Sequence, residues 1–97
     1  MAKLEEGERQ LLMRDLEGWT FLRDAIHKDF TFQGFRGAIA FVDRIAELAT
    51  AAGHHPDLEI HYNRVVVSLT THDDGGVTEA DISLAARIDG VVEPDDG

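Results

Sequence analysis

The chain has 97 residues, 43% of them hydrophobic, and nine basic against nineteen acidic side chains give it a formal net charge of −10. This length suits a single domain over residues 1–97, and the acidic excess argues against nucleic acids and anionic membrane surfaces as partners, since both need clustered Lys and Arg. The absence of cysteine excludes disulfides and a thiolate nucleophile, and the lack of a long apolar run or a secretory signal leads us to expect a soluble, cytoplasmic protein.

The first third of the sequence predicts a short helix and a pair of strands. Residues 4–16 place leucines among charged residues with helical spacing, and Gly18 ends this amphipathic segment. Apolar and polar residues then alternate through residues 26–32, which is typical of a half-buried strand. Residues 19–23 are expected to form its short partner.

A long helix is predicted from Phe35 to Gly53. Glycine is the residue best able to adopt the left-handed conformation that ends a helix, and Pro56 prevents the helix from resuming. The apolar stripe that predicts this helix consists of Phe35, Ala38, Ile39, Val42, Ile45, Ala46 and Ala49.

The second half predicts two strands and a final helix. Strands are expected at residues 58–62 and 65–72, with Tyr62, Asn63 and Arg64 forming the turn. The final helix begins with Thr78 as its N-cap and with Asp81 in the capping-box position. Its buried stripe is predicted to contain Ile82, Ala85, Ala86 and Ile88.

The order of the elements is therefore α-β-β-α-β-β-α. Adjacent strands joined by short turns, with helices between the hairpins, predict an α+β fold in which three helices pack on one face of a four-stranded antiparallel sheet. Residues 93–97 are expected to be a frayed acidic tail.

The histidines are the unusual chemical content of this sequence. His54 and His55 directly follow the long helix and His72 is expected to end the last strand, and side chains at the ends of rigid elements commonly form sites. Imidazole titrates near neutral pH, and the negative end of the preceding helix favours a protonated His54, which would suit a proton donor. His27 and His61 share the outward phase of their strands and are expected to face solvent.

Other interpretations of these three histidines remain open at this point. An ordinary polar loop would have the same composition. A zinc or iron site is possible, but adjacent histidines do not easily chelate one ion and no His-Glu-x-x-His or His-x-His spacing is present, so we expect no metal. Asp81 is explained as a helix cap and is assigned no chemistry. The sequence also lacks a Gly-x-Ser-x-Gly elbow and a phosphate-binding loop.

The spacing of these residues resembles a known signature. The run His54-His55-Pro56, followed by Tyr62, His72 and Asp81, is similar to the motif of the pterin-4a-carbinolamine dehydratase family. The segments "GW", "RDAI" and "LTTH" also resemble that family, and the similarity extends over residues 11–88. The first motif position, usually charged, is Thr50 here, and Glu47 one helical turn earlier is a candidate to compensate.

The resemblance implies that the protein removes water from a 4a-hydroxytetrahydropterin to give quinonoid dihydropterin, a step that regenerates the cofactor of aromatic amino acid hydroxylases. It implies an acid–base pair of His54 and His72, with helix polarity favouring His54 as the acid, and a His55 that binds and orients the pterin. The residues implied to line the pterin pocket beside them are Gly53, Thr70, Thr71 and Asp73.

The resemblance also implies what accompanies this reaction. Two histidines can carry it out without a metal or a covalent intermediate, so we expect no cofactor. The family assembles as dimers that extend the sheet, or as tetramers formed through helices, and we expect a homodimer or homotetramer. The alternative is a non-catalytic binding or assembly module with the same fold; Thr50 favours it, and the intact histidine pattern argues against it.

Overall fold

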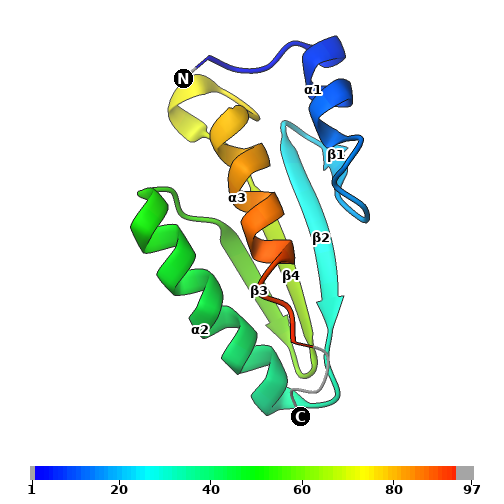
Figure 1. Ribbon diagram of the computed structural model, residues 1–97, viewed down its shortest axis with the longest axis vertical. Helices are drawn as coiled ribbons and strands as arrows, with labels where there is room; N and C mark the ends of the chain where they lie inside the picture. Colours follow the sequence, from blue (N-terminus) through cyan, green and yellow to red (C-terminus); the bar gives the residue numbers. More distant parts are fainter. Residues whose placement is uncertain (1, 94–97) are drawn as a thin grey trace.

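The computed structural model describes residues 2–93, and its element order confirms the predicted α-β-β-α-β-β-α fold (Figure 1). The elements are α1 (Glu6–Met13), β1 (Thr20–Leu22), β2 (Ala25–Thr31), α2 (Phe35–Ala52), β3 (Asp57–His61), β4 (Arg64–Leu69), the 3-10 helix η1 (His72–Asp74) and α3 (Glu79–Asp89).

The four strands form one antiparallel sheet in the order β1-β2-β4-β3. Both hairpins have two-residue turns with left-handed backbone: Arg23 and Asp24 have φ of 53° and 62°, and Tyr62 has φ of 55°. Positive φ in such a turn matches the right-handed twist of the paired strands. The two hairpins meet through β2 and β4, which are distant in sequence and pair at the centre of the sheet.

One face of this sheet forms the core. Ile26 of β2 pairs with Leu69 of β4, and both side chains are completely buried, as are Val65 and Val67. α2 and α3 run across this face (Figure 1). α1 lies over the β1 end of the same face, because the Arg9 guanidinium is 3.6 Å from the ring centroid of Phe21, whose cross-strand partner is Ile26.

The buried side of α2 is narrower than the predicted stripe. Phe35, Ile39 and Ala46 are exposed, and Phe41, absent from the prediction, is completely buried. The physical reason is the position of α2, which contacts β4 on one side and α3 on another and leaves the rest of its surface to solvent. The residues that α2 buries are Gly37, Ala38, Phe41, Ile45 and Ala49.

Three further expectations need correction. α1 spans only Glu6–Met13, so Leu4 and Leu16 are buried from the segments that flank it. In α3 the prediction buried Ala86, but Ala86 is exposed and Leu84 is buried. β4 ends at Leu69, three residues before the predicted end. The end of the expected acidic tail, residues 94–97, lies outside the described residues. Within residues 2–93 none of the helices is long and apolar enough to cross a bilayer.

Candidate active site

The residues predicted to form a site line one pocket. The pocket has a volume of about 280 Å³ and lies where the end of α2, the segment after β4 and η1 meet. The residues that line it are Gly53, His54, His55, Thr70, Thr71, His72 and Asp73. Two segments, residues 53–55 and 70–73, which lie about fifteen residues apart in the sequence, are thus joined into one concave surface.

The end of α2 fixes the backbone of His54. Gly53 adopts the left-handed conformation with φ of 63°. Its N–H donates to the carbonyl of Thr50 at 3.2 Å, and the N–H of His54 donates to the carbonyl of Ala49 at 3.1 Å. This pair of hydrogen bonds is the Schellman motif, which satisfies the last carbonyls of the helix and turns the chain sharply. The predicted stop at Gly53 is confirmed, and it directs the next residue toward α3.

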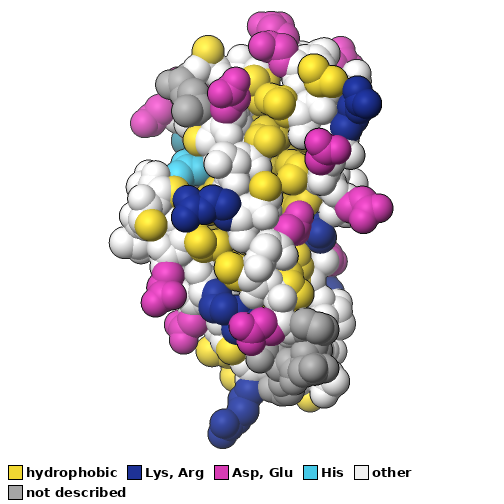
Figure 2. Space-filling model, in the orientation of Figure 1, with side chains coloured by type: hydrophobic (Ala, Val, Ile, Leu, Met, Phe, Trp, Pro, Cys, Tyr) yellow, Lys and Arg dark blue, Asp and Glu magenta, His cyan; other side chains and the backbone are white. Residues whose placement is uncertain are grey.

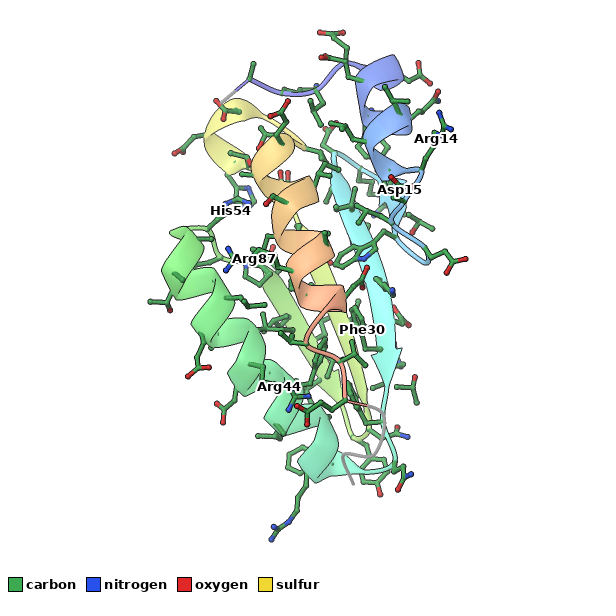
Figure 3. All side chains as sticks on the ribbon, viewed as in Figure 1. Arg14, Asp15, Phe30, Arg44, His54 and Arg87 are labelled. Carbon is green, nitrogen blue, oxygen red and sulfur yellow. The ribbon has the colours of Figure 1, made fainter. Side chains whose placement is uncertain are left out.

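His54 is held by the buried carboxylate of Asp81, a residue of the motif for which the sequence predicted only a capping role. Nε2 of His54 lies 2.5 Å from Oδ1 of Asp81. The Asp81 side chain is fully buried and that of His54 is 18% exposed. Figure 3 shows His54 projecting from the end of α2 toward the start of α3. The prediction that Asp81 serves in the capping box of α3 is confirmed, but Asp81 also binds the histidine.

Two threonines complete the hydrogen-bond network around Asp81. Its Oδ2 accepts a hydrogen bond from the Thr71 hydroxyl at 2.8 Å and another from the backbone N–H of Thr78 at 2.9 Å. The two threonine hydroxyls are 2.9 Å apart. A hydroxyl has one hydrogen to donate, so Thr78 must donate to Thr71 while Thr71 donates to the carboxylate. A buried carboxylate requires such partners, because an unpaired one would be very costly to desolvate.

This arrangement determines which nitrogen of His54 can react. Because Asp81 accepts the proton of Nε2, Nδ1 is the nitrogen available to a bound molecule. A carboxylate in this position fixes the tautomer of the ring and stabilises the positive charge that the ring carries when both nitrogens are protonated. His54 can therefore exchange protons at Nδ1 from a fixed orientation.

His72 reaches the pocket from a turn and not, as predicted, from the end of a strand. After β4 ends, the N–H of Thr71 donates to the carbonyl of Gly76 at 2.9 Å, and this bond closes the loop that contains η1. Gly75, with φ of 77°, provides the left-handed residue that ends η1. His72 and His55 are both exposed, whereas His54 is half-buried. His54 thus forms the deeper wall of the pocket, and the other two histidines lie at its rim.

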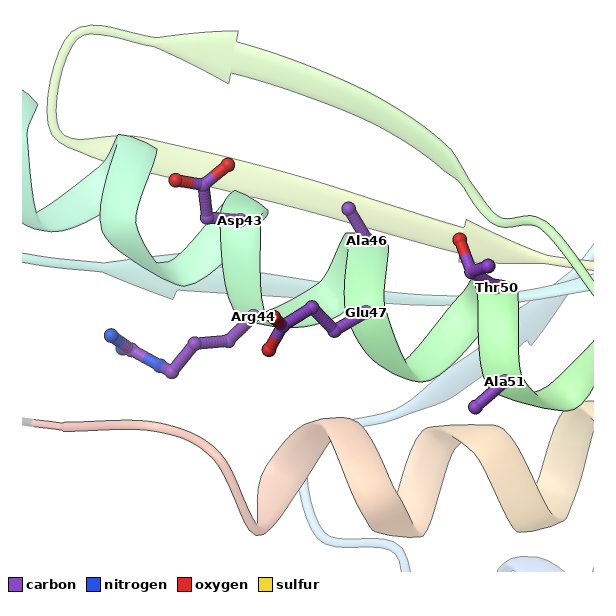
Figure 4. A pocket seen from close by; sticks show the side chains of 6 residues that line it. All are labelled: Asp43, Arg44, Ala46, Glu47, Thr50 and Ala51. Carbon is purple, nitrogen blue, oxygen red and sulfur yellow. The ribbon is translucent and has the colours of Figure 1, made fainter.

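The first position of the motif lies elsewhere. Thr50 and Glu47 line a wider, shallower hollow of about 690 Å³ along the outer side of α2 (Figure 4). All the residues that line it come from this one helix, so it has no opposing wall that could enclose a small molecule. The suggestion that Glu47 compensates for Thr50 beside the histidines is not supported, because neither residue lines the histidine pocket.

The remaining histidines lie on the sheet face opposite the helices. His61 is exposed as predicted, and its Nε2 is 3.1 Å from a carboxylate oxygen of Glu59. His27 is half-buried and not fully exposed, because its two ring nitrogens lie 2.7 Å from the Ser68 hydroxyl and 3.0 Å from the Leu22 carbonyl. Among the described residues, no three His, Asp or Glu side chains are placed to bind a metal ion together.

The fold and the pocket define a small α+β protein whose site can exchange protons through imidazole. The sequence profile described as Pterin 4 alpha carbinolamine dehydratase matches residues 2–91, and the chain belongs to this family.

Relatives with similar sequences cover almost the whole chain. A protein from Thermomicrobium roseum is 48% identical over 88 residues, which are 91% of this chain and 95% of the relative. One from Aquifex aeolicus is 47% identical over 93 residues, 96% of this chain and 94% of the relative. Both are provisionally named pterin-4-alpha-carbinolamine dehydratase.

Solved structures share the fold. The crystal structure of a transcriptional coactivator/pterin dehydratase from Brucella melitensis is 38% identical, covers 94% of this chain and 99% of that chain, and superposes with a TM-score of 0.90. A pterin dehydratase-like protein, identified as a RuBisCO assembly factor in the alpha-carboxysome, is 24% identical with a TM-score of 0.65 and covers 79% and 89% of the two chains. The latter likeness concerns the fold alone.

Proposed function

We propose that this protein dehydrates a 4a-hydroxytetrahydropterin to the quinonoid dihydropterin by histidine acid–base catalysis, and so takes part in tetrahydropterin recycling. The observation that carries the proposal is the contact of 2.5 Å between His54 and the buried Asp81, in a pocket that His72 also lines. Membership of the dehydratase family supports the same reaction class.

The reaction requires one proton donor and one proton acceptor. A protonated imidazole gives its proton to the 4a-hydroxyl, the C4a–O bond breaks, and water leaves. The electron pair of the N5–H bond forms the C4a=N5 double bond as a second imidazole takes the N5 proton. The substrate loses one water molecule in total, and solvent restores the protonation state of the two histidines.

We assign the donor role to His54 and the acceptor role to His72. The buried carboxylate of Asp81 stabilises the positive charge on a donor imidazolium, and the negative end of α2 acts in the same direction. His72 is exposed, so a proton that it accepts can pass directly to water. His55, at the pocket rim beside His54, is proposed to bind and orient the pterin.

The test is turnover of chemically generated 4a-hydroxytetrahydropterin, followed by ultraviolet absorbance. His54→Ala and His72→Ala should each lower kcat by about 10²-fold or more, the usual effect of losing a general acid or base. His61→Ala, which removes an exposed histidine from the opposite sheet face, is the matched control and should keep the full rate. Unchanged rates in both pocket variants would refute the assigned pair.

The same assay separates catalysis from the alternative of a binding or assembly module. A protein without turnover that co-purifies in stoichiometric amounts with another protein would favour that alternative.

We also propose that the protein forms a homodimer or homotetramer, because α2 exposes Phe35 and Ile39 to solvent. Light scattering coupled to size-exclusion chromatography tests this, and a monomer at micromolar concentration would contradict it.

A further inference from the structure

A second pocket adjoins the histidine pocket on the other side of His54. It has a volume of about 290 Å³ and lies between the end of α2 and one side of α3. The residues that line it are Ala52, His54, Glu79, Ala80, Ser83, Leu84 and Arg87. His54 is the residue that lines both pockets. In Figure 2 a histidine surface and a basic side chain lie near each other in the region where α2 and α3 meet.

Arg87 gives this pocket a positive charge that has no ion-pair partner in the described part of the chain. Its side chain extends from α3 toward the end of α2, on the side where His54 lies (Figure 3). Lys28 binds a carboxylate at 2.9 Å and Arg64 binds one at 3.1 Å. Like several exposed arginines, Arg87 binds none among residues 2–93, but it is the arginine that lines this pocket. In a chain with nineteen acidic residues, a guanidinium that faces a pocket and has no carboxylate partner is available to an external anion.

The chemistry of the substrate relates this pocket to the first one. The reacting atoms of a 4a-hydroxytetrahydropterin are C4a and N5, and carbon C6, which bears the variable substituent, is bonded directly to N5. In the proposed reaction His54 acts on the hydroxyl at C4a, which is only two bonds from C6, so the C6 substituent begins close to His54. We propose that the pocket between α2 and α3 receives the C6 substituent and that Arg87 binds a carboxylate or phosphate on it. This inference rests on the proposed function, since it uses the orientation that the reaction imposes.

The spacing along α3 sets the length of substituent that fits. At a rise of about 1.5 Å per residue, Ser83 lies about 3 Å and Arg87 about 9 Å along the helix from Asp81, the residue that binds His54. A short hydroxyalkyl group therefore reaches Ser83, whereas a substituent with an anionic end several bonds from C6 reaches Arg87. Glu79 lies at the opposite end of the pocket, about 12 Å from Arg87, and repels an anion placed near the pterin ring. The two charges together favour an extended substituent with its negative group at the far end.

Arg87 also lies in the last turn of α3, where a positive charge stabilises the helix dipole. That role needs only the charge, whereas paired hydrogen bonds to a carboxylate or phosphate need the planar guanidinium. Arg87→Lys therefore separates the two roles. It should keep the thermal stability of the protein and lose part of the anion binding.

The experiment measures binding of two probes by isothermal titration calorimetry. One is 6-methyl-7,8-dihydropterin, which has an uncharged C6 substituent, and the other is 7,8-dihydrofolate, whose C6 substituent ends in carboxylates. The measured quantity is the ratio of the affinity for dihydrofolate to the affinity for the methyl compound. Arg87→Ala should lower this ratio by about tenfold, the effect of losing one charged hydrogen-bonded pair. Arg87→Lys should give an affinity ratio between those of the wild type and Arg87→Ala. Glu79→Gln removes a repelling carboxylate and should raise the ratio above that of the wild type. Arg36→Ala, an exposed cation on α2 that lines neither pocket, is the control and should leave the ratio unchanged.

Two outcomes distinguish this inference from the proposed function. If the wild type dehydrates a neutral 4a-hydroxytetrahydropterin but Arg87→Ala leaves the ratio of the two affinities unchanged, the C6 pocket is refuted and the dehydratase stands. If the ratio changes as expected but no dehydration occurs, the pocket binds the substituent and the proposed reaction is wrong.

Discussion

His54 and Asp81 are 27 residues apart in the sequence, yet Nε2 of the histidine lies 2.5 Å from Oδ1 of a carboxylate that is completely buried. Asp81 belongs at the same time to the capping box of α3 and to the hydrogen-bond network of Thr71 and Thr78. The stability of α3 and the orientation of the histidine therefore depend on one side chain.

Replacing Asp81 by Asn should impair catalysis more than folding. The amide keeps the shape of the side chain but has no negative charge to stabilise a protonated His54, so we expect kcat to fall by about 10²-fold. The pH dependence of kcat should change as well, which loss of a purely structural residue would not cause. Steady-state kinetics across pH measures both effects.

Thr78→Ala is the matched control for this variant. It removes the N-cap of the same helix and should lower the free energy of unfolding by about 1 kcal/mol. The carboxylate of Asp81 and its contact with His54 remain, so most of the activity should remain too. If Thr78→Ala and Asp81→Asn lose activity in proportion to their lost stability, Asp81 has no separate role in positioning His54.

Thr71→Val tests the hydroxyl that connects the network. Valine has nearly the same shape but cannot donate to Asp81 or accept from Thr78, so two buried polar groups each lose a partner. We expect the free energy of unfolding to fall by about 2 kcal/mol. Thr71→Ser restores the hydroxyl and should recover most of this loss. Urea denaturation of the three proteins makes the comparison, and equal stability of the valine variant would contradict the hydrogen bonds as described.

Gly53→Ala tests the turn that carries His54. The methyl group would meet no neighbouring atom within 4 Å, so the cost arises from the backbone, which has φ of 63°. We expect a loss of about 1 kcal/mol in the free energy of unfolding, together with a lower kcat because relaxation of the turn displaces His54. Gly7→Ala, at a position inside α1 that is equally open and has ordinary helical backbone, should stabilise the protein slightly. Thermal unfolding measures both variants. A lower Tm for Gly53→Ala and a slightly higher Tm for Gly7→Ala would confirm the reasoning.

His55→Ala should affect binding more than chemistry. His55 lines the rim of the pocket and is exposed, without the buried partner that His54 has. If it orients the pterin, KM should rise severalfold while kcat changes less than in His54→Ala. A fall in kcat as large as that of the His54 variant, at unchanged KM, would instead place His55 among the groups that transfer protons.

The prediction of the fold succeeded where local patterns carry the information. The alternation in β2, the stop of α2 at Gly53 and the capping box of α3 each depend on residues within a few positions of one another. The prediction was wrong where a neighbouring element decides burial. Phe35 and Ile39 have the spacing of core residues, but α2 meets only part of the core, and Phe41 is buried in their place.

The sequence by itself determined the order of the elements, the hairpins and the set of polar residues at the ends of α2 and β4, because backbone conformation responds to short-range periodicity and capping. Only the tertiary structure decided that Asp81 binds His54, that Thr50 and Glu47 do not line the histidine pocket, and that Arg87 lines a second pocket beside it. These relationships follow from the packing of α3 against α2 over one face of the sheet. That packing sets distances between side chains far apart along the chain, and no local pattern encodes them.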